Sequence, residues 1–347
     1  MAKLYVFNPE HDLALAANLS NFTAPLAGRK MRHDLGFIPA LWAGDEDYIL
    51  VDDVEQAKFE FDKINAELKL GKRQFVDKCQ LRRLYINKVE PWGWDLALRS
   101  FLIRNGVDAV PTEDEIAMIR ELSHRRQASR LLTKLQIKGV TGVSYEADNM
   151  ADIHQLLDRY CNIVIKAPWS SSGRGVRFVE ETIDGYQERW IKNVIEQQGS
   201  VMVEPFYNKV KDFGMEFESD GEGRVSYLGL SLFDTKNGAY TGNLIATEDV
   251  KLRLLGEYRL PISEVRDKIC DILGEDLKGK YKGPFGLDMM VVTTTEGLLF
   301  HPCVEINLRR TMGHVALAVN PFADGITRVM QITKKENNMV MLFSLKI

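Results

Sequence analysis

Residues 163–179 read IVIKAPWSSSGRGVRFV. Two runs rich in β-branched residues flank serines and glycines, and this pattern predicts a strand, a loop and a second strand. Serine and glycine backbones allow a phosphate group to approach closely, and Lys166 and Arg174 could supply positive charge. The G-x-x-x-x-G-K-[ST] order of a P-loop is absent. From spacing alone, a phosphate-binding loop and a plain hairpin turn are equally good interpretations.

A second informative region lies further along the chain, in the segments GLDMMVV and FHPCVEINLRR. Asp288 belongs to the first predicted strand. Glu305, Asn307 and Arg309 alternate along the second, so they share one face. Carboxylate and amide oxygens suit Mg²⁺, and Arg309 could bind a carboxylate or phosphoryl group through two hydrogen bonds. Taken alone, these residues also fit an exposed polar strand face with a surface ion pair.

The first third of the chain alternates short apolar runs with helix-like stretches. Lys3–Phe7 and Tyr48–Val51 are predicted strands, and Gln56–Leu70 is a predicted amphipathic helix. This alternation predicts a parallel sheet with helices on its faces. Asn8 and Pro9 are typical of the N-cap and first turn of a helix.

Three further polar residues, Glu10, His11 and Asp12, follow the first predicted strand. The carboxyl end of a parallel strand is where α/β sheets bind ligands, so we expect at least one of the three to contact a substrate. Helix capping is the alternative role for one of the acids.

Composition excludes several classes of protein. The 347 residues include 45 Lys and Arg and 49 Asp and Glu, for a net charge of −4, and 45% are hydrophobic. The chain is too apolar for intrinsic disorder, has no apolar run of about 18 residues, and lacks the basic excess of a nonspecific nucleic-acid binder. The four cysteines form no C-x-x-C pair, and the first residues lack the apolar core of a signal peptide. We therefore expect a cytoplasmic protein without membrane or nucleic-acid partners.

Together these pieces resemble the ATP-grasp superfamily, which includes D-alanine–D-alanine ligase and the biotin carboxylase subunit. From Ser123 to Ala316 the chain carries, in the family's order, a basic helix start, a strand lysine, a glycine/serine loop, VMVEP, an Asp strand and E-x-N. The resemblance implies an α/β plus α+β chain. A Rossmann-like preceding domain over 1–122 would be followed by a two-lobed ATP-grasp domain, with lobes at 123–200 and 201–347.

The resemblance also implies site residues. The basic helix start offers Arg125 or Arg126, and we assign the role to Arg126. The implied ATP contacts are Arg126, Lys166, Ser170, Ser171, Ser172, Gly173, Arg174, Gly175, Glu204, Phe206 and Asp212. The implied ligands for Mg²⁺, or for Mn²⁺ in its place, are Asp288, Glu305 and Asn307. Lys166 and Arg309 are the implied catalytic residues, and the substrate contacts are Glu10, His11, Asp12, Arg310 and His314.

The activity implied by the resemblance is that of an ATP-dependent carboxylate–amine or carboxylate–thiol ligase. Such an enzyme forms an acyl phosphate from a small-molecule carboxylate and releases ADP and phosphate; many relatives are homodimers. The chain has Gly286 where many ligases carry an arginine. A nucleotide-binding regulatory protein without turnover is therefore one alternative, and a phosphotransferase on the same fold is another.

Overall fold

The computed structural model describes residues 2–170, 175–236, 239–295, 297–321, 325 and 327–345, with only the backbone at 236 and 239. The chain divides into two compact units. The first contains the described residues of 1–120, 241–247 and 309–347, and the second contains those of 121–240 and 248–308. A parallel sheet in the first unit and antiparallel sheets in the second confirm the predicted fold class.

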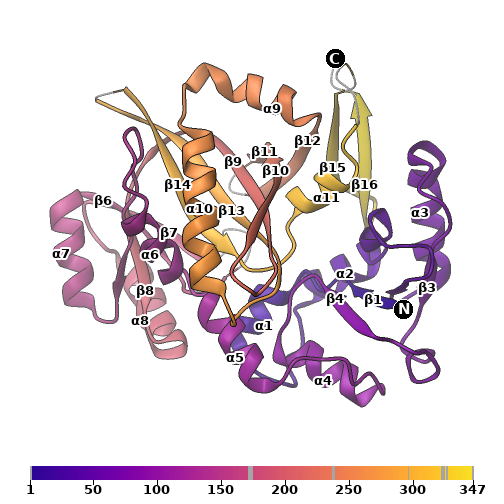
Figure 1. Cartoon of the computed structure of the whole chain (residues 1–347). Coiled ribbons are helices and arrows are strands. Elements are labelled where there is room, and N and C mark those ends of the chain that lie inside the picture. The colour runs from indigo at the N-terminus through magenta and orange to yellow at the C-terminus, as the bar shows by residue number, and fades with distance from the viewer. Residues whose placement is uncertain are drawn as a thin grey trace. The chain divides into compact units, whose positions relative to one another are not determined.

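A four-stranded parallel sheet forms the centre of the first unit, in the order β3-β2-β1-β4 (Figure 1). Its strands are β1 (Lys3–Val6), β2 (Tyr48–Leu50), β3 (Gln74–Val76) and β4 (Lys88–Pro91). Their apolar residues are buried on both faces, as expected for a parallel sheet covered by helices. Because β2 and β4 flank β1, the strand order reverses there, and such a reversal opens a crevice at the carboxyl ends of the strands.

The helices of this unit are α1 (His11–Ala17), α2 (Leu26–Leu35), η1 (Ile38–Leu41), α3 (Val54–Leu68), η2 (Leu81–Arg83), α4 (Leu96–Arg104) and α5 (Glu113–Leu122). The α5 N-terminus carries a reciprocal capping pair. The Glu115 N–H donates to Thr112 Oγ1 (3.2 Å), and the Thr112 N–H donates to Glu115 Oε2 (2.7 Å).

Later parts of the chain complete the first unit. They are β12 (Ala239–Ile245), α11 (Met312–Ala318), β15 (Arg328–Lys335) and β16 (Asn338–Leu345), with the three strands antiparallel in the order β12-β15-β16. Val315, Met330 and Met341 join Leu35 and Phe37 in one buried cluster. This grouping differs from the predicted division into consecutive segments, because the apolar face of the last strands packs against residues of the N-terminal unit.

Two antiparallel sheets form the second unit. One has the order β5-β8-β6-β7 and the other β10-β9-β13-β14. The strands of this unit are β5 (Tyr145–Ala147), β6 (Asn162–Lys166), β7 (Val176–Glu180), β8 (Val201–Pro205), β9 (Asn208–Ser219), β10 (Val225–Ser231), β11 (Phe233–Lys236), β13 (Gly283–Thr294) and β14 (Gly297–Asn307).

The helices of the second unit are α6 (Arg126–Lys134), α7 (Met150–Tyr160), α8 (Gly185–Gln198), α9 (Glu248–Leu255), η3 (Gly256–Tyr258) and α10 (Ile262–Leu277). Helices α7 and α8 cover the first sheet through Ile153, Leu157 and Ile191, which pack against Ile163 and Val203. Helix α10 packs against β10 of the second sheet (Figure 1). Each unit therefore has its own core.

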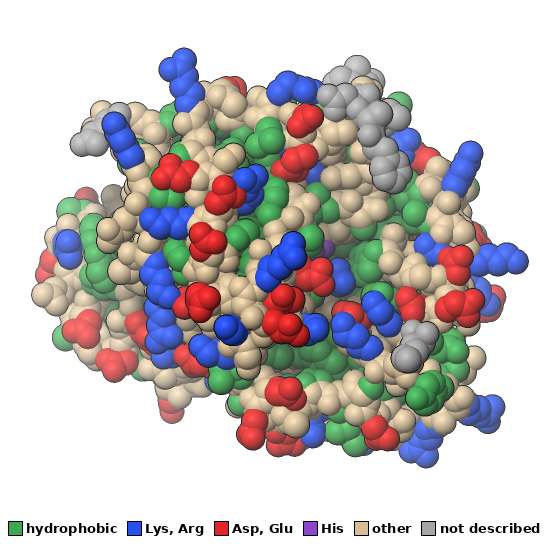
Figure 2. Space-filling model, in the orientation of Figure 1, with side chains coloured by type: hydrophobic (Ala, Val, Ile, Leu, Met, Phe, Trp, Pro, Cys, Tyr) green, Lys and Arg blue, Asp and Glu red, His purple; other side chains and the backbone are tan. Residues whose placement is uncertain are grey.

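Charged side chains of both signs are interspersed over the face shown in Figure 2. This mixture follows from the near balance of 45 basic and 49 acidic residues. In the described part of the chain, no helix has the length and apolar content needed to cross a membrane.

Candidate functional site

The strand lysine of the predicted nucleotide site is buried and paired. Strand β6 ends at Lys166, whose Nζ donates to Glu204 Oε2 on β8 at 2.6 Å. The two residues are 8% and 6% exposed. Their strands are antiparallel neighbours, with Val164 opposite Glu204, so the lysine reaches diagonally across the ladder. The structure thus brings two of the predicted ATP contacts together.

Arg125, immediately before α6, joins three parts of the predicted site. Its Nη1 donates to the Ala167 carbonyl (2.6 Å) and to Ser170 Oγ (2.7 Å), at the beginning of the serine/glycine loop. Its Nη2 donates to Glu305 Oε2 (2.8 Å) on β14. The Arg125 side chain is 7% exposed, so these charge-assisted bonds lie in a largely water-free region.

The two described ends of the loop meet closely. The Ala167 N–H donates to the Gly175 carbonyl (2.8 Å), and a Cβ at position 175 would lie 2.3 Å from Ser170 Cβ. Only glycine fits at 175 without moving the backbone. Ser171, Ser172, Gly173 and Arg174, which are predicted phosphate contacts, lie outside the described residues.

The predicted metal ligands share one face of the β13–β14 hairpin. Asp288 is directly opposite Glu305, and Asn307 is opposite Gly286, in the antiparallel register. Side chains that face each other in this way project to the same side of the sheet. Two carboxylates and one amide provide the oxygen donors that Mg²⁺ prefers, so the residues present fit this ion. Within the described ranges no cluster of three or more His, Cys, Asp and Glu forms a separate metal site.

Strand β14 also contributes buried groups between Lys166 and the acidic residues. Burial lowers the pKa of His301 to about 4, although Glu204 opposes the shift, and the ring packs edge-on against Tyr207. Burial raises the pKa of the Cys303 thiol well above its usual range, and Glu204 and Asp288 add to the shift. Both side chains are therefore neutral at pH 7, as expected in a dry wall of a binding site.

Solved structures with the same architecture are ligases. N5-carboxyaminoimidazole synthetase from Staphylococcus aureus, complexed with ADP, aligns with a TM-score of 0.54 at 11% identity over 99% of this chain and 93% of that one. Biotin carboxylase from Campylobacter jejuni, in a β,γ-ATP complex, aligns with a TM-score of 0.52 at 13% identity over 96% and 76%. The Thermus thermophilus N5-carboxyaminoimidazole ribonucleotide synthetase gives 0.50 at 14% identity over 96% and 84%.

The chain has the ATP-grasp fold. The sequence itself matches no family model and no curated protein. At identities of 10–14% among the neighbours with a TM-score of at least 0.50, the likeness establishes the architecture alone.

Three predicted nucleotide contacts of this ATP-grasp fold have other partners. Arg126 pairs with Glu146 (3.2 Å), on a different side from Glu305. Phe206 is 48% exposed and packs edge-on against Phe178. Asp212 accepts hydrogen bonds from Lys209 and from Thr235 Oγ1.

The predicted catalytic arginine Arg309 belongs to the first unit. Its Nε and Nη2 donate to the two carboxylate oxygens of Asp12 at 2.9 and 2.7 Å. This bidentate pair joins two predicted site residues that are 297 positions apart in the sequence. The carboxylate fixes the plane of the guanidinium group.

Three other predicted substrate contacts, Arg310, His314 and His11, also have neighbours within the first unit. The Arg310 guanidinium lies over the Trp42 ring, 4.9 Å from its centre. His314 caps α11, where its Nδ1 accepts the Thr311 N–H at 3.1 Å. His11 is 1% exposed and packs against Gly93, where a Cβ would lie 2.6 Å from the ring.

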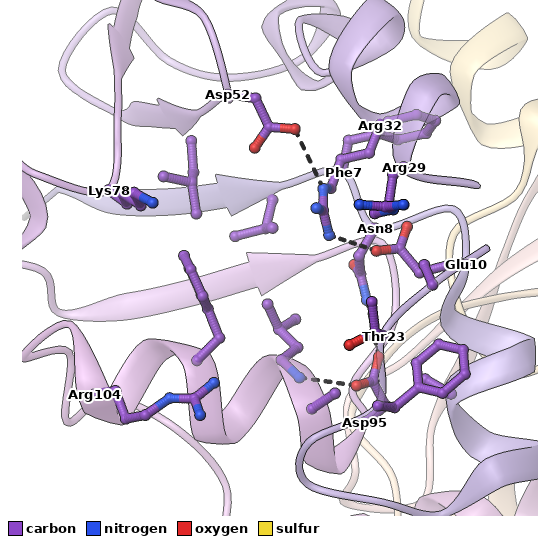
Figure 3. Close-up of a pocket in the computed structure, with 18 of the residues that line it drawn as sticks. Phe7, Asn8, Glu10, Thr23, Arg29, Arg32, Asp52, Lys78, Asp95 and Arg104 are labelled. Atoms are coloured by element: carbon purple, nitrogen blue, oxygen red, sulfur yellow. Dashed lines mark hydrogen bonds and ion pairs between the residues drawn. The ribbon is translucent and has the colours of Figure 1, made fainter. Parts of the chain in front are cut away.

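Of the predicted substrate residues, Glu10 lines a pocket in the first unit. The pocket has a volume of about 740 Å³ and opens where β1, β2 and β3 end (Figure 3). Glu10 Oε1 accepts from Arg32 Nη1 at 2.6 Å, and Arg32 Nε lies 3.5 Å from Asp52 Oδ2. Burial raises the pKa of Glu10, although the charge of Arg32 opposes the shift.

The predicted N-cap role of Asn8 is wrong. Helix α1 begins after Glu10, and its N-cap makes no side-chain hydrogen bond. The Asn8 amide instead donates to the Gly93 carbonyl (2.8 Å) and to Asp95 Oδ2 (3.1 Å). Asn8 therefore links the loops that follow β1 and β4, and this long-range partner has no signal in the local sequence.

Sequence reasoning also missed the basic residues of the pocket, which are Arg29, Arg32, Lys78 and Arg104. One signal was present. Arg29 and Arg32 are three positions apart, the spacing that places two side chains on one face of a helix, and Lys78 follows the end of a short apolar run.

Proposed function

We propose that the protein is an ATP-dependent carboxylate–amine or carboxylate–thiol ligase that acts through an acyl phosphate and releases ADP and phosphate. The observation that carries the proposal is the position of Arg125. Its guanidinium group contacts the start of the serine/glycine loop and Glu305 together. Phosphate groups would be held where these elements meet.

The roles follow from the charges. Arg125 and Lys166 would bind phosphate oxygens, and their present partners Glu305 and Glu204 keep both cations in place before nucleotide binds. Asp288, Glu305 and Asn307 would hold Mg²⁺ or Mn²⁺, which when bound supplies charge neutralisation to the phosphates. Arg309, oriented by Asp12, would stabilise the acyl phosphate.

Nucleotide binding is the first test. Arg125→Gln should weaken MgATP binding by about tenfold or more, because a charged hydrogen bond contributes about 1.5–3 kcal/mol. Arg126→Gln removes the neighbouring arginine and should leave the affinity within about twofold of the unmodified protein. Calorimetric titration gives both constants, and Arg125→Lys, which retains a cation, separates a charge effect from loss of folding. Equal effects of the two glutamine variants would contradict the assignment.

The same proteins also test the reaction. A ligase should release ADP and phosphate only when a carboxylate and an amine or thiol are both present. Nucleotide binding without ADP formation on any substrate pair would favour the regulatory alternative, which the glycine opposite Asn307 also supports. Transfer of phosphate to an alcohol without a second nucleophile would favour the phosphotransferase.

A further inference from the structure

Three of the basic residues that line the pocket of the first unit have no carboxylate partner among the described residues. The lining includes four basic and four acidic side chains, so these charges balance. Glu10 and Asp52 both pair with Arg32, and Asp77 and Asp95 accept backbone N–H groups of Cys79 and Leu98. Arg29, Lys78 and Arg104 form no ion pair within the described parts of the chain, and all three are exposed. These three cations are therefore available to an anionic ligand.

The basic residues of the pocket lie at its two ends. In Figure 3, Arg29 and Arg32 lie beside Glu10, and Lys78 and Arg104 lie at the opposite side of the view. Helix α4 indicates the length of the pocket, because two lining residues mark the ends of this helix. Asp95 caps its beginning and Arg104 is its last residue. At 1.5 Å per residue, these two positions are about 13 Å apart along the axis.

Apolar side chains line the pocket as well. Leu98, Phe101 and Arg104 are spaced three apart along α4, so they follow one another on a single helix face. Val6 and Leu50 add apolar surface from the ends of β1 and β2. A ligand that fills this space has an apolar body.

At the Arg29 end of the pocket, one carboxylate oxygen of Glu10 is buried without a hydrogen-bond partner among the described residues. Glu10 Oε2 is buried and has no hydrogen-bond partner among the described residues, while Oε1 is held by Arg32. Burial raises the pKa of this carboxyl group, although the charge of Arg32 opposes the shift. A hydrogen-bonding group of a bound ligand would satisfy the oxygen.

We propose that this pocket binds an elongated small-molecule dianion, with one acidic group at Arg29 and the second at Lys78 and Arg104. Guanidinium groups bind carboxylates and phosphates equally well in a bidentate manner, so the shared feature is two separated anionic groups on an apolar body. The role of this dianion as a substrate rests on the proposed function, whereas its binding to the pocket is independent of that function.

Binding is measured by calorimetry without nucleotide, in a buffer free of phosphate and carboxylic acids. The probes are glutarate, adipate and suberate as dicarboxylates, 3-phosphoglycerate as a phosphate-bearing acid, and hexanoate as the monoanion. At least one dianion should bind about tenfold or more tightly than hexanoate. The preferred arm identifies the acidic group as carboxylate or phosphate.

The variants Arg29→Gln and Arg104→Gln should each weaken dianion binding by about tenfold. Both residues are exposed, so the fold should tolerate the changes. Arg83→Gln, on η2 and outside the pocket lining, is the matched control and should have no effect. Binding that is no tighter for any of these dianions than for hexanoate, or that is unchanged in both pocket variants, would overturn the proposal.

MgATP affinity, measured in parallel, separates this proposal from the proposed function. Dianion binding that survives in a protein with no MgATP affinity would contradict only the ligase assignment. Normal MgATP binding without dianion binding would contradict only the pocket assignment.

Discussion

At the scale of single residues, Lys251 on α9 shows how burial changes the pKa of a charged side chain. It is completely buried, and its Nζ donates to the Leu230 carbonyl at 2.9 Å. Burial lowers its pKa from 10.5 to about 8, although the charges of Glu248 and Glu216 oppose the shift. The folded protein therefore holds this proton less tightly than the unfolded chain does.

The sign of the pH effect follows. Between pH 8 and 10.5 the unfolded chain retains the Lys251 proton and the folded protein has released it, so this residue makes the protein more stable as pH rises. Below pH 8 the full cost of the buried charge is present. Compared with Lys251→Met, the unmodified protein should gain up to about 1.4 kcal/mol per pH unit in this window. Urea unfolding at pH 7 and 9.5 measures the gain. The exposed Lys72→Met is the control, and parallel pH profiles for all three proteins would refute the assignment.

At the residue scale, the resemblance assigned Lys166 and Glu204 to one site, and the structure pairs these two side chains on neighbouring strands. The basic residue at the start of α6 is harder to assign. Arg125 and Arg126 are adjacent, and neighbouring helical residues point about 100° apart. Choosing between them requires the exact first turn of α6 and the position of Glu305, and neither can be read from the local sequence.

At the scale of elements, α2 is attached to the last strand of the chain through Asp34. This side chain is 2% exposed, and its Oδ2 accepts the Met339 N–H at 2.7 Å. Burial alone would raise the pKa of Asp34, but the Met339 N–H and Lys30 outweigh it and lower the pKa. The resulting stabilisation is present above the ordinary value of 3.8 and is lost as pH falls below it.

Replacing this carboxylate tests the attachment. Asp34→Ala should lower the free energy of unfolding at pH 7 by about 1–3 kcal/mol, because the partly buried Met339 N–H loses its acceptor. Asp34→Asn retains an acceptor and should lose less. The exposed Asp62→Ala on α3 serves as the reference in denaturant titrations. An Asp34→Ala protein as stable as the Asp62→Ala protein would show that the bond contributes nothing.

Element prediction from sequence was accurate where the apolar pattern was regular. The predicted helix Gln56–Leu70 is present as α3, Val54–Leu68, and the strands around Asp288 and Glu305 are present. Their register was not predictable. An irregularity between Asp288 and Met290 shifts the pairing, and such a bulge depends on the two strands together.

At the scale of the whole molecule, the first unit is built from three separated stretches. The first of these stretches ends at Arg120. The sequence could not predict that residues 309–345 pack in the first unit, because the apolar pattern of a strand such as β15 does not specify which core the strand joins. Only the tertiary packing of Met330 and Met341 shows it.

Because of this discontinuity, a substitution near the C-terminus should destabilise the sheet formed by N-terminal residues. Met330 is fully buried, and Met330→Ala should destabilise the first unit by about 2–5 kcal/mol through the cavity left behind. Hydrogen exchange at the Ile49 amide in β2 should accelerate accordingly. Met118→Ala, at a 39% exposed position on α5, is the control and should change little. Unchanged protection at Ile49 in Met330→Ala would mean that the sheet is stable without these strands.

The same discontinuity sets an order of events during synthesis. Residues up to 120 are translated before the rest of the first unit, so the apolar cluster that they begin still lacks Ile245, Val315, Met330 and Met341. At about 5–20 residues per second, roughly 10–40 s pass before the last of these side chains is available. The second unit has all its residues by 308 and so can close earlier. The core of the first unit is therefore completed after that of the second unit, although its sheet is translated earlier. During that interval the incompletely buried apolar face of the sheet can bind a chaperone.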